Sequence, residues 1–126
     1  MLNKTKIFLL AFLLLLGSLT LISKFAHSEE SVFNTLSTGR QTVTTAGTRV
    51  QLSTNSIPCT RVVITAETDN TGIITVGGSS VVAALATRQG IPLSSGDSLT
   101  AYTNNINKIY LDSTVDTDGV TFAYYL

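Results

Sequence analysis

The chain has 126 residues, and its eight Lys and Arg residues balance its eight Asp and Glu residues to a formal net charge of zero at pH 7. The residues after Ser28 hold five of the basic residues and all of the acidic ones, a net charge of −3. Neutralising phosphates requires a basic surface, so this charge argues against a nucleic-acid partner. The single Cys excludes an internal disulfide bond.

A signal for export opens the chain. Lys4 and Lys6 come before an apolar run over residues 7–22, and Ala26 and Ser28 then form a small-x-small cleavage signature. This order is typical of a secretory signal peptide, so we expect cleavage after Ser28 and a secreted or cell-surface, extracytoplasmic location. The alternative is an uncleaved membrane anchor, although the run of 16 residues is shorter than the roughly 20 of a spanning helix.

The rest of the chain divides into an arm and a domain. Residues 29–39 are polar without a hydrophobic period, which predicts an arm or linker. From residue 40 to 126, stretches rich in Val, Ile, Thr and Tyr alternate with clusters of Gly, Asn, Asp and Ser, as in an all-β domain. The expected strands are Gln41–Thr45, Thr48–Ser53, Arg61–Glu67, Ile73–Val76, Gly90–Leu93, Ser98–Thr103, Lys108–Asp112 and Val120–Leu126. Ser80–Ala86 suits either a strand or one helical turn.

Two expected strands show a clear alternation of apolar residues. In the segment 61–67, Val62, Ile64 and Ala66 share one side, and in the segment 120–126 the even-numbered residues are all apolar or aromatic. The sequence therefore predicts a small antiparallel β-sandwich of about eight short strands. We expect its connection to be jelly-roll-like or Greek-key, after an N-terminal hydrophobic signal or anchor helix.

The domain lacks most catalytic side chains. Its only candidate pair of carboxylates is Glu67 and Asp69, which could flank a glycosidic bond but also fit a solvated acid and a turn-forming Asp. The sole histidine, His27, precedes the predicted cleavage site, and Cys59 therefore has no base partner. We expect no enzymatic activity and no cofactor. Cys59 is expected to be a buried small apolar side chain, with pairing to another chain as the alternative.

Three acids near the C-terminus form a candidate metal site. Asp112, Asp116 and Asp118 precede Gly119, and calcium sites often draw oxygen ligands from acid-rich loops that contain a Gly. Their spacing lacks the alternation of an EF-hand, and Asp and Gly also form plain turns. The sequence therefore leaves open a calcium site or a β-turn.

Two tyrosines are candidates for ligand binding. Tyr102 and Tyr110 fall in expected strands at positions that could face solvent, and the chain has no Trp. Exposed aromatic rings can stack on sugars, whereas Tyr in a strand also serves ordinary sheet packing. A secreted carbohydrate-binding module that uses these two residues is thus one functional hypothesis.

The region from Gln41 to Leu126 resembles a small β-domain found in phage and other viral structural proteins. The motifs that carry the resemblance are Arg61-Val62-Val63-Ile64, Asp69-Asn70-Thr71-Gly72, Thr75-Val76-Gly77-Gly78, Gly90-Ile91-Pro92-Leu93, Ser95-Gly96-Asp97-Ser98, Asn107-Lys108-Ile109-Tyr110 and Gly119-Val120-Thr121-Phe122. The resemblance implies a non-enzymatic component of a particle or appendage, which works by self-association or by docking on a larger assembly.

The preferred functional hypothesis is an exported structural or interaction module whose partners are proteins or further copies of itself. A glycan is the alternative ligand, and a membrane is involved only through an uncleaved N-terminal segment. A fimbrial-type subunit is a further alternative, because such subunits are exported and end in an alternating aromatic strand. The polar arm over residues 29–39 lacks the apolar alternation that donor-strand exchange needs.

Overall fold

The computed structural model of the protein describes Lys4 and residues 35–126. Apart from Lys4, the predicted signal peptide or anchor lies outside the described residues, and so do its cleavage residues Ala26 and Ser28 and most of the predicted arm. The compact unit Asn34–Leu126 contains all the strands of the described residues. Within the described residues, no helix combines the length and the hydrophobicity that a membrane span needs.

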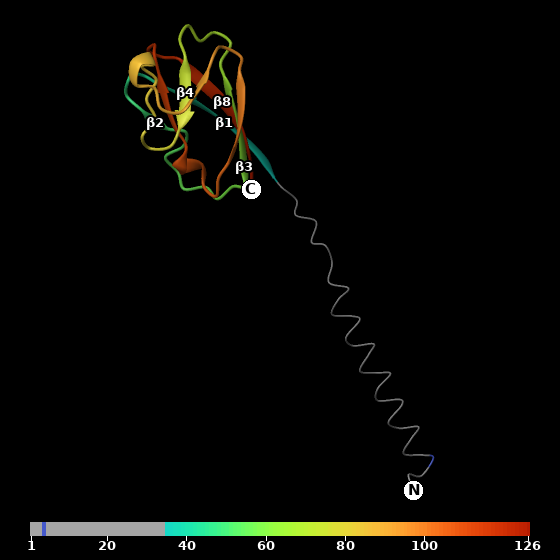
Figure 1. The fold of residues 1–126 in the computed structure, drawn as a ribbon. Coiled ribbons are helices and arrows are strands. Elements are labelled where there is room, and N and C mark those ends of the chain that lie inside the picture. The colour runs from blue at the N-terminus through green and yellow to red at the C-terminus, as the bar shows by residue number, and fades with distance from the viewer. Residues whose placement is uncertain (1–3, 5–34) are drawn as a thin grey trace. The chain divides into compact units, whose positions relative to one another are not determined.

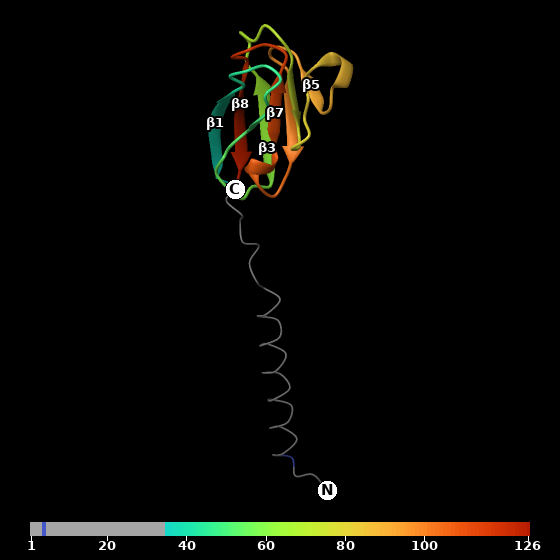
Figure 2. The same cartoon turned by 90° about the vertical axis from the view of Figure 1, so that its left-hand side faces the viewer.

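Eight strands form two antiparallel four-stranded sheets (Figures 1 and 2). Sheet A has the order β1-β8-β3-β6, and sheet B has the order β2-β7-β4-β5. The strands are β1 (Leu36–Thr42), β2 (Val50–Gln51), β3 (Arg61–Ala66), β4 (Ile74–Gly77), β5 (Ile91–Leu93), β6 (Ser98–Tyr102), β7 (Tyr110–Ser113) and β8 (Gly119–Tyr125). Two 3-10 helices, η1 (Leu85–Thr87) and η2 (Ile106–Lys108), complete the described elements. The predicted all-β, antiparallel architecture is confirmed.

Consecutive strands mostly belong to different sheets. Only β4 and β5 are successive along the chain and paired in one sheet. Every other connection crosses between the sheets, so most strand partners are far apart in sequence, as β1 and β8 are. The tight turn at Ala46-Gly47, where Gly47 has a φ of 76°, therefore leads from sheet A to sheet B instead of closing a hairpin.

The core lies between the sheets and follows the alternation expected from the sequence. In β3, Val62, Ile64 and Ala66 are buried, and the residues between them are half-buried. In β8, Val120 and Phe122 are buried on the same side. The main core residues are Val43, Leu52, Cys59, Val62, Ile64, Ala66, Ile74, Val76, Leu93, Ile106, Ile109, Leu111, Val120 and Phe122. Burying this apolar surface is the main force that holds the two sheets together.

The first strand begins earlier than the sequence predicted. β1 pairs with β8 from Leu36, opposite Tyr125, to Thr42, opposite Gly119. The domain therefore starts four residues before Arg40, and the end of the predicted arm forms a sheet edge. At the other end of the chain, the amide of Leu126 donates to the carbonyl of Thr35 at 3.3 Å.

Residues 78–90, which we call the cover segment, lie against the outer face of sheet B. Thr75 and Asp112 point away from the core by register, yet both are buried. Ala83 of the cover segment is buried as well, and its amide donates to Asp112 Oδ2 at 2.7 Å. Gly90 has a φ of +116°, and a Cβ there would lie 2.8 Å from Thr75 Cγ2, so only glycine fits this close approach.

The cover segment includes the region that the sequence left open. Ser80–Ala86 forms neither a regular strand nor an α-helix. Val82 makes an isolated bridge to Gln89, and the 3-10 helix η1 starts at Leu85. This part of the chain projects beside β5, in gold, in Figure 2.

Candidate functional site

Sheet A presents an open outer face in the part of the chain that the structure describes. Residues along a strand alternate between core and solvent, so each of its four strands contributes every second residue. These residues are Leu36, Thr38 and Arg40 of β1, Thr121, Ala123 and Tyr125 of β8, Arg61, Val63 and Thr65 of β3, and Ser98, Thr100 and Tyr102 of β6. All of them are exposed or half-buried. We call this surface the outer face.

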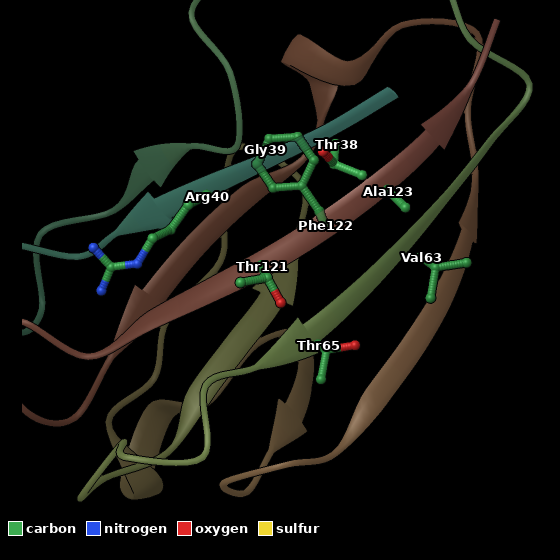
Figure 3. Close-up of a pocket in the computed structure, with 8 residues that line it drawn as sticks. All are labelled: Thr38, Gly39, Arg40, Val63, Thr65, Thr121, Phe122 and Ala123. Atoms are coloured by element: carbon green, nitrogen blue, oxygen red, sulfur yellow. The ribbon is translucent and has the colours of Figure 1, made fainter. Parts of the chain in front are cut away.

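The centre of the outer face consists of short side chains. The strand register aligns Thr38, Ala123 and Val63 in one row across β1, β8 and β3, and it places Thr121 beside Thr65 in the next. Figure 3 shows these residues along a shallow depression. Branched side chains such as Thr and Val have few rotamers to lose on burial, which suits contact with another flat surface.

One end of the outer face is acidic. Arg40 Nε contacts Glu67 Oε1, and Arg40 Nη2 donates to Glu67 Oε2 at 2.8 Å. These hydrogen bonds hold the pKa of Glu67 below its ordinary value. Asp69 is exposed. It lines one shallow depression together with Arg40, Glu67 and Thr121. Two carboxylates and one guanidinium give this end a local charge of −1.

The opposite end of the outer face is aromatic and cationic. The register places Leu36, Tyr125, Arg61 and Tyr102 in one row across the sheet. The guanidinium carbon of Arg61 lies 4.1 Å from the centroid of the Tyr125 ring, which is a cation–π geometry. Tyr102 is 81 % exposed on the edge strand β6. Among residues 35–126, Arg61 forms no salt bridge, so no acidic side chain is paired with its guanidinium.

The structure does not bring the two predicted sugar-binding tyrosines together. Tyr102 lies on β6 of sheet A, whereas Tyr110 lies on β7 of sheet B. Tyr110 is half-buried and lines a separate polar depression with Gln51, Asn107 and Lys108. Tyr102 and Tyr110 therefore cannot form one stacking platform within a single chain.

The three carboxylates of the candidate calcium site bond to three different segments of the chain. Asp112 is buried beneath the cover segment, where it accepts the amide of Ala83. Asp116 is exposed, and its Oδ1 accepts the amide of Ala46 at 2.7 Å. Within the described range, no group of three His, Cys, Asp or Glu residues could hold a metal ion. The structure thus does not assemble a calcium site from Asp112, Asp116 and Asp118.

The third acid, Asp118, organises the neighbouring turn. Its buried carboxylate accepts the amides of Thr71 at 3.1 Å and Gly72 at 2.7 Å. The side chain of Asn70 adds two hydrogen bonds of 2.8 Å, one to the carbonyl and one from the amide of Gly119. The segment Asp69–Gly72 is therefore fixed against the loop that leads into β8.

The surroundings of Glu67 and Cys59 do not favour catalysis. Glu67 is paired with Arg40, and its lowered pKa is the opposite of what a general acid needs. Cys59 is 5 % exposed, and burial raises the pKa of its thiol. A buried thiol of this kind is a poor nucleophile, because less of it is present as thiolate. The expectation of a buried Cys59 is confirmed.

Sequence reasoning identified parts of the outer face but not the surface as a whole. The alternation of Arg61, Val63 and Thr65 with core residues is visible in the sequence, whereas Leu36 and Thr38 fall in the segment that the sequence predicts as an arm. No protein-family model, curated protein or solved structure matches the chain, so the geometry of the outer face is the basis for inferring its function.

Proposed function

We propose that the protein is an exported, non-enzymatic structural module that self-associates through the outer face. The observation that carries this proposal is the contrast between the two sheets. The outer side of sheet B is covered by the chain's own residues 78–90, whereas among residues 35–126 nothing buries the outer face of sheet A. The centre of the outer face consists of short Thr, Ala and Val side chains, which suits packing against the outer face of another copy.

We infer that the fold is a jelly roll. The strand orders β1-β8-β3-β6 and β2-β7-β4-β5, with connections that cross between the sheets, support this connectivity. Jelly rolls serve in viral capsids and in lectins, so the fold is compatible with a particle component. The sequence resemblance to phage and viral structural proteins supports the same role, either in a virion or in a related module displayed on a cell surface.

Export is part of the proposal and rests on the sequence alone. The order of Lys4, Lys6, the apolar run and the small-x-small signature supports a secretory signal that ends at Ser28. N-terminal sequencing of the protein from the extracytoplasmic fraction tests it. A first residue of Glu29 supports a cleaved signal, and an intact N-terminus in the membrane fraction supports an anchor. Protein retained in the cytoplasm would overturn export.

The test of self-association compares two Ala→Arg variants of the full-length chain. Ala123 lies in the centre of the outer face, whereas Ala86 is exposed in η1 on the opposite side of the fold. Sedimentation equilibrium of the wild type should show concentration-dependent oligomers. Ala123→Arg should abolish them because it places a long charged side chain in the contact, and Ala86→Arg should not. Equal association of both variants would overturn the proposed surface.

Carbohydrate binding remains a second proposal, supported by the exposure of Tyr102 beside Arg61. A glycan array tests it with the wild type and with Tyr102→Ala. Binding that is lost in the variant supports a sugar site on the aromatic end of the outer face. An array without any binding removes the proposal.

A further inference from the structure

We infer that two copies of the chain associate with their strands antiparallel, so that the cationic end of each outer face lies over the acidic end of the other. This inference rests on the proposed self-association and specifies its geometry and its charge contacts. The partner is a second copy, because the outer face carries both halves of a complementary pair of charges.

The cationic half is Arg61. Its guanidinium is stacked on Tyr125, and within residues 35–126 it has no acidic partner. Stacking on the ring removes part of its hydration and holds the side chain flat against the sheet, which lowers the entropy lost when an anion binds. Arg61 is therefore a preorganised cation that lacks an acidic partner among the residues that the structure describes.

The acidic half surrounds Glu67. Hydrogen bonding to Glu67, together with the charges of Glu67 and Asp69, raises the pKa of Arg40. The single guanidinium of Arg40 thus faces two carboxylates. Asp69 is exposed, and no hydrogen bond to its carboxylate is found among the described residues. Asp69 is the carboxylate that remains available to a cation from outside.

The strand register brings these halves together in one orientation. Arg61, Val63, Thr65 and Glu67 are spaced two residues apart, so they point to the same side of an extended chain. A two-fold axis that runs across the strands between Val63 and Thr65 places Arg61 of each copy opposite Glu67 of the other, with Asp69 nearby. It also places each Val63 opposite a Thr65.

The parallel orientation is disfavoured by charge. A two-fold axis along the strands would bring the two cationic ends together and the two acidic ends together. Like charges at an interface are repulsive, whereas the antiparallel arrangement satisfies both ends at once. The antiparallel pair is also closed with respect to the outer face, because each copy uses that face once and both faces are covered in the pair.

Charge reversals in the full-length chain test this arrangement. Arg61→Glu and Asp69→Arg each replace two attractive contacts of the symmetric pair with repulsive ones. Each single variant should therefore raise the dissociation constant in sedimentation equilibrium by about tenfold or more. An equimolar mixture of the two single variants should form a heterodimer, because both of its contacts are again between opposite charges. The double variant should associate to within a few-fold of the wild type.

The control variants distinguish a failure of the antiparallel arrangement from a failure of the proposed self-association through the outer face. Arg49→Glu makes the same charge change at an exposed residue that is not on the outer face, and it should leave association unchanged. If Arg61→Glu lowers the melting temperature, Arg61→Gln should still weaken association, and the wild type should weaken as the NaCl concentration rises. Loss of association with Ala123→Arg, but no effect of the reversals and no heterodimer, would overturn the antiparallel arrangement and leave the proposed surface intact. A wild type that stays monomeric would overturn both.

Discussion

The ring of Phe122 occupies the space beside Gly39 in which a side chain would otherwise stand. Gly39 of β1 and Phe122 of β8 are directly opposite each other, and a Cβ on Gly39 would lie 2.7 Å from Cε2 of the ring. An aromatic residue that covers a glycine on the neighbouring strand compensates for the missing side chain. This contact holds the edge strand β1 to sheet A.

Gly39→Ala should destabilise the domain. The new methyl group would force Phe122 from its position, and overpacking of this kind costs about 1–3 kcal/mol. Chemical denaturation measures the loss. Gly78→Ala is the matched control, because a Cβ at Gly78 would have no neighbour within 4 Å, and its stability should change little. Equal stability of the two variants would contradict the role assigned to the glycine.

Glu67 should make stability depend on acid pH. Hydrogen bonding from Arg40 lowers the pKa of Glu67 in the folded state below its ordinary value of 4.5. Because the pKa of Glu67 is lower in the folded state than in the unfolded state, its ionised form stabilises the fold at pH values above the unfolded-state pKa. This stabilisation is lost as the pH falls through the folded-state pKa. Glu67→Gln should therefore lower the melting temperature at pH 7 but much less at pH 2.

The control for this prediction is Asp69→Asn, the same chemical change on a neighbouring acid without a salt bridge. At a protein concentration low enough to keep every variant monomeric, its melting temperature should follow that of the wild type across the pH range. A difference between wild type and Glu67→Gln that is constant from pH 7 to pH 2 would mean that the ion pair is not the cause.

Asp112 should hold the cover segment on sheet B. Asp112→Ala removes the acceptor of the buried Ala83 amide, and a lost hydrogen bond to a charged group costs about 1.5–3 kcal/mol. Limited digestion with trypsin reports on the segment, because it contains Arg88, a half-buried residue whose Nε donates to the Ala83 carbonyl. Cleavage after Arg88 should become faster. Asp116→Ala, at an exposed acid, should leave the rate at Arg88 unchanged, and equal rates in both variants would argue against the role of Asp112.

Cys59 should be unreactive in the native protein. It is buried, and burial raises the pKa of its thiol, so little thiolate is accessible at neutral pH. A thiol reagent should modify it only at the rate at which the protein unfolds, and the reaction should become immediate in denaturant. A disulfide-linked dimer on a non-reducing gel, or rapid native modification, would contradict this prediction.

The parts of the fold that depend on local pattern were predictable from the sequence. The alternation in β3 and β8 identified both strands and their buried sides, because a half-exposed strand repeats every two residues. β1 was missed in part, since its inward positions include Ser37 and Gly39. Neither residue is an apolar residue of the kind that marks a buried strand position. The space beside Gly39 is filled by Phe122, whose strand β8 is far away in the sequence.

The surroundings of the acids could not be predicted, because they depend on distant segments. Asp112 occupies an outward position of β7, where the sequence alone is compatible with a calcium ligand or with a residue of a plain turn. It is buried because residues 78–90 return over sheet B, and nothing in the sequence near Asp112 signals that return. The same limit applies to the pairing of Arg40 with Glu67, which are 27 residues apart.

The hydrogen bond between Leu126 and Thr35 makes the two ends of the β-domain neighbours. A short flexible linker could therefore join them without disturbing the pairing of β1 with β8. The domain could then be reopened at an exposed loop such as residues 47–49 to give a circular permutant. For the same reason, it could be inserted as a passenger into a surface loop of another protein, because both ends would leave at the same point.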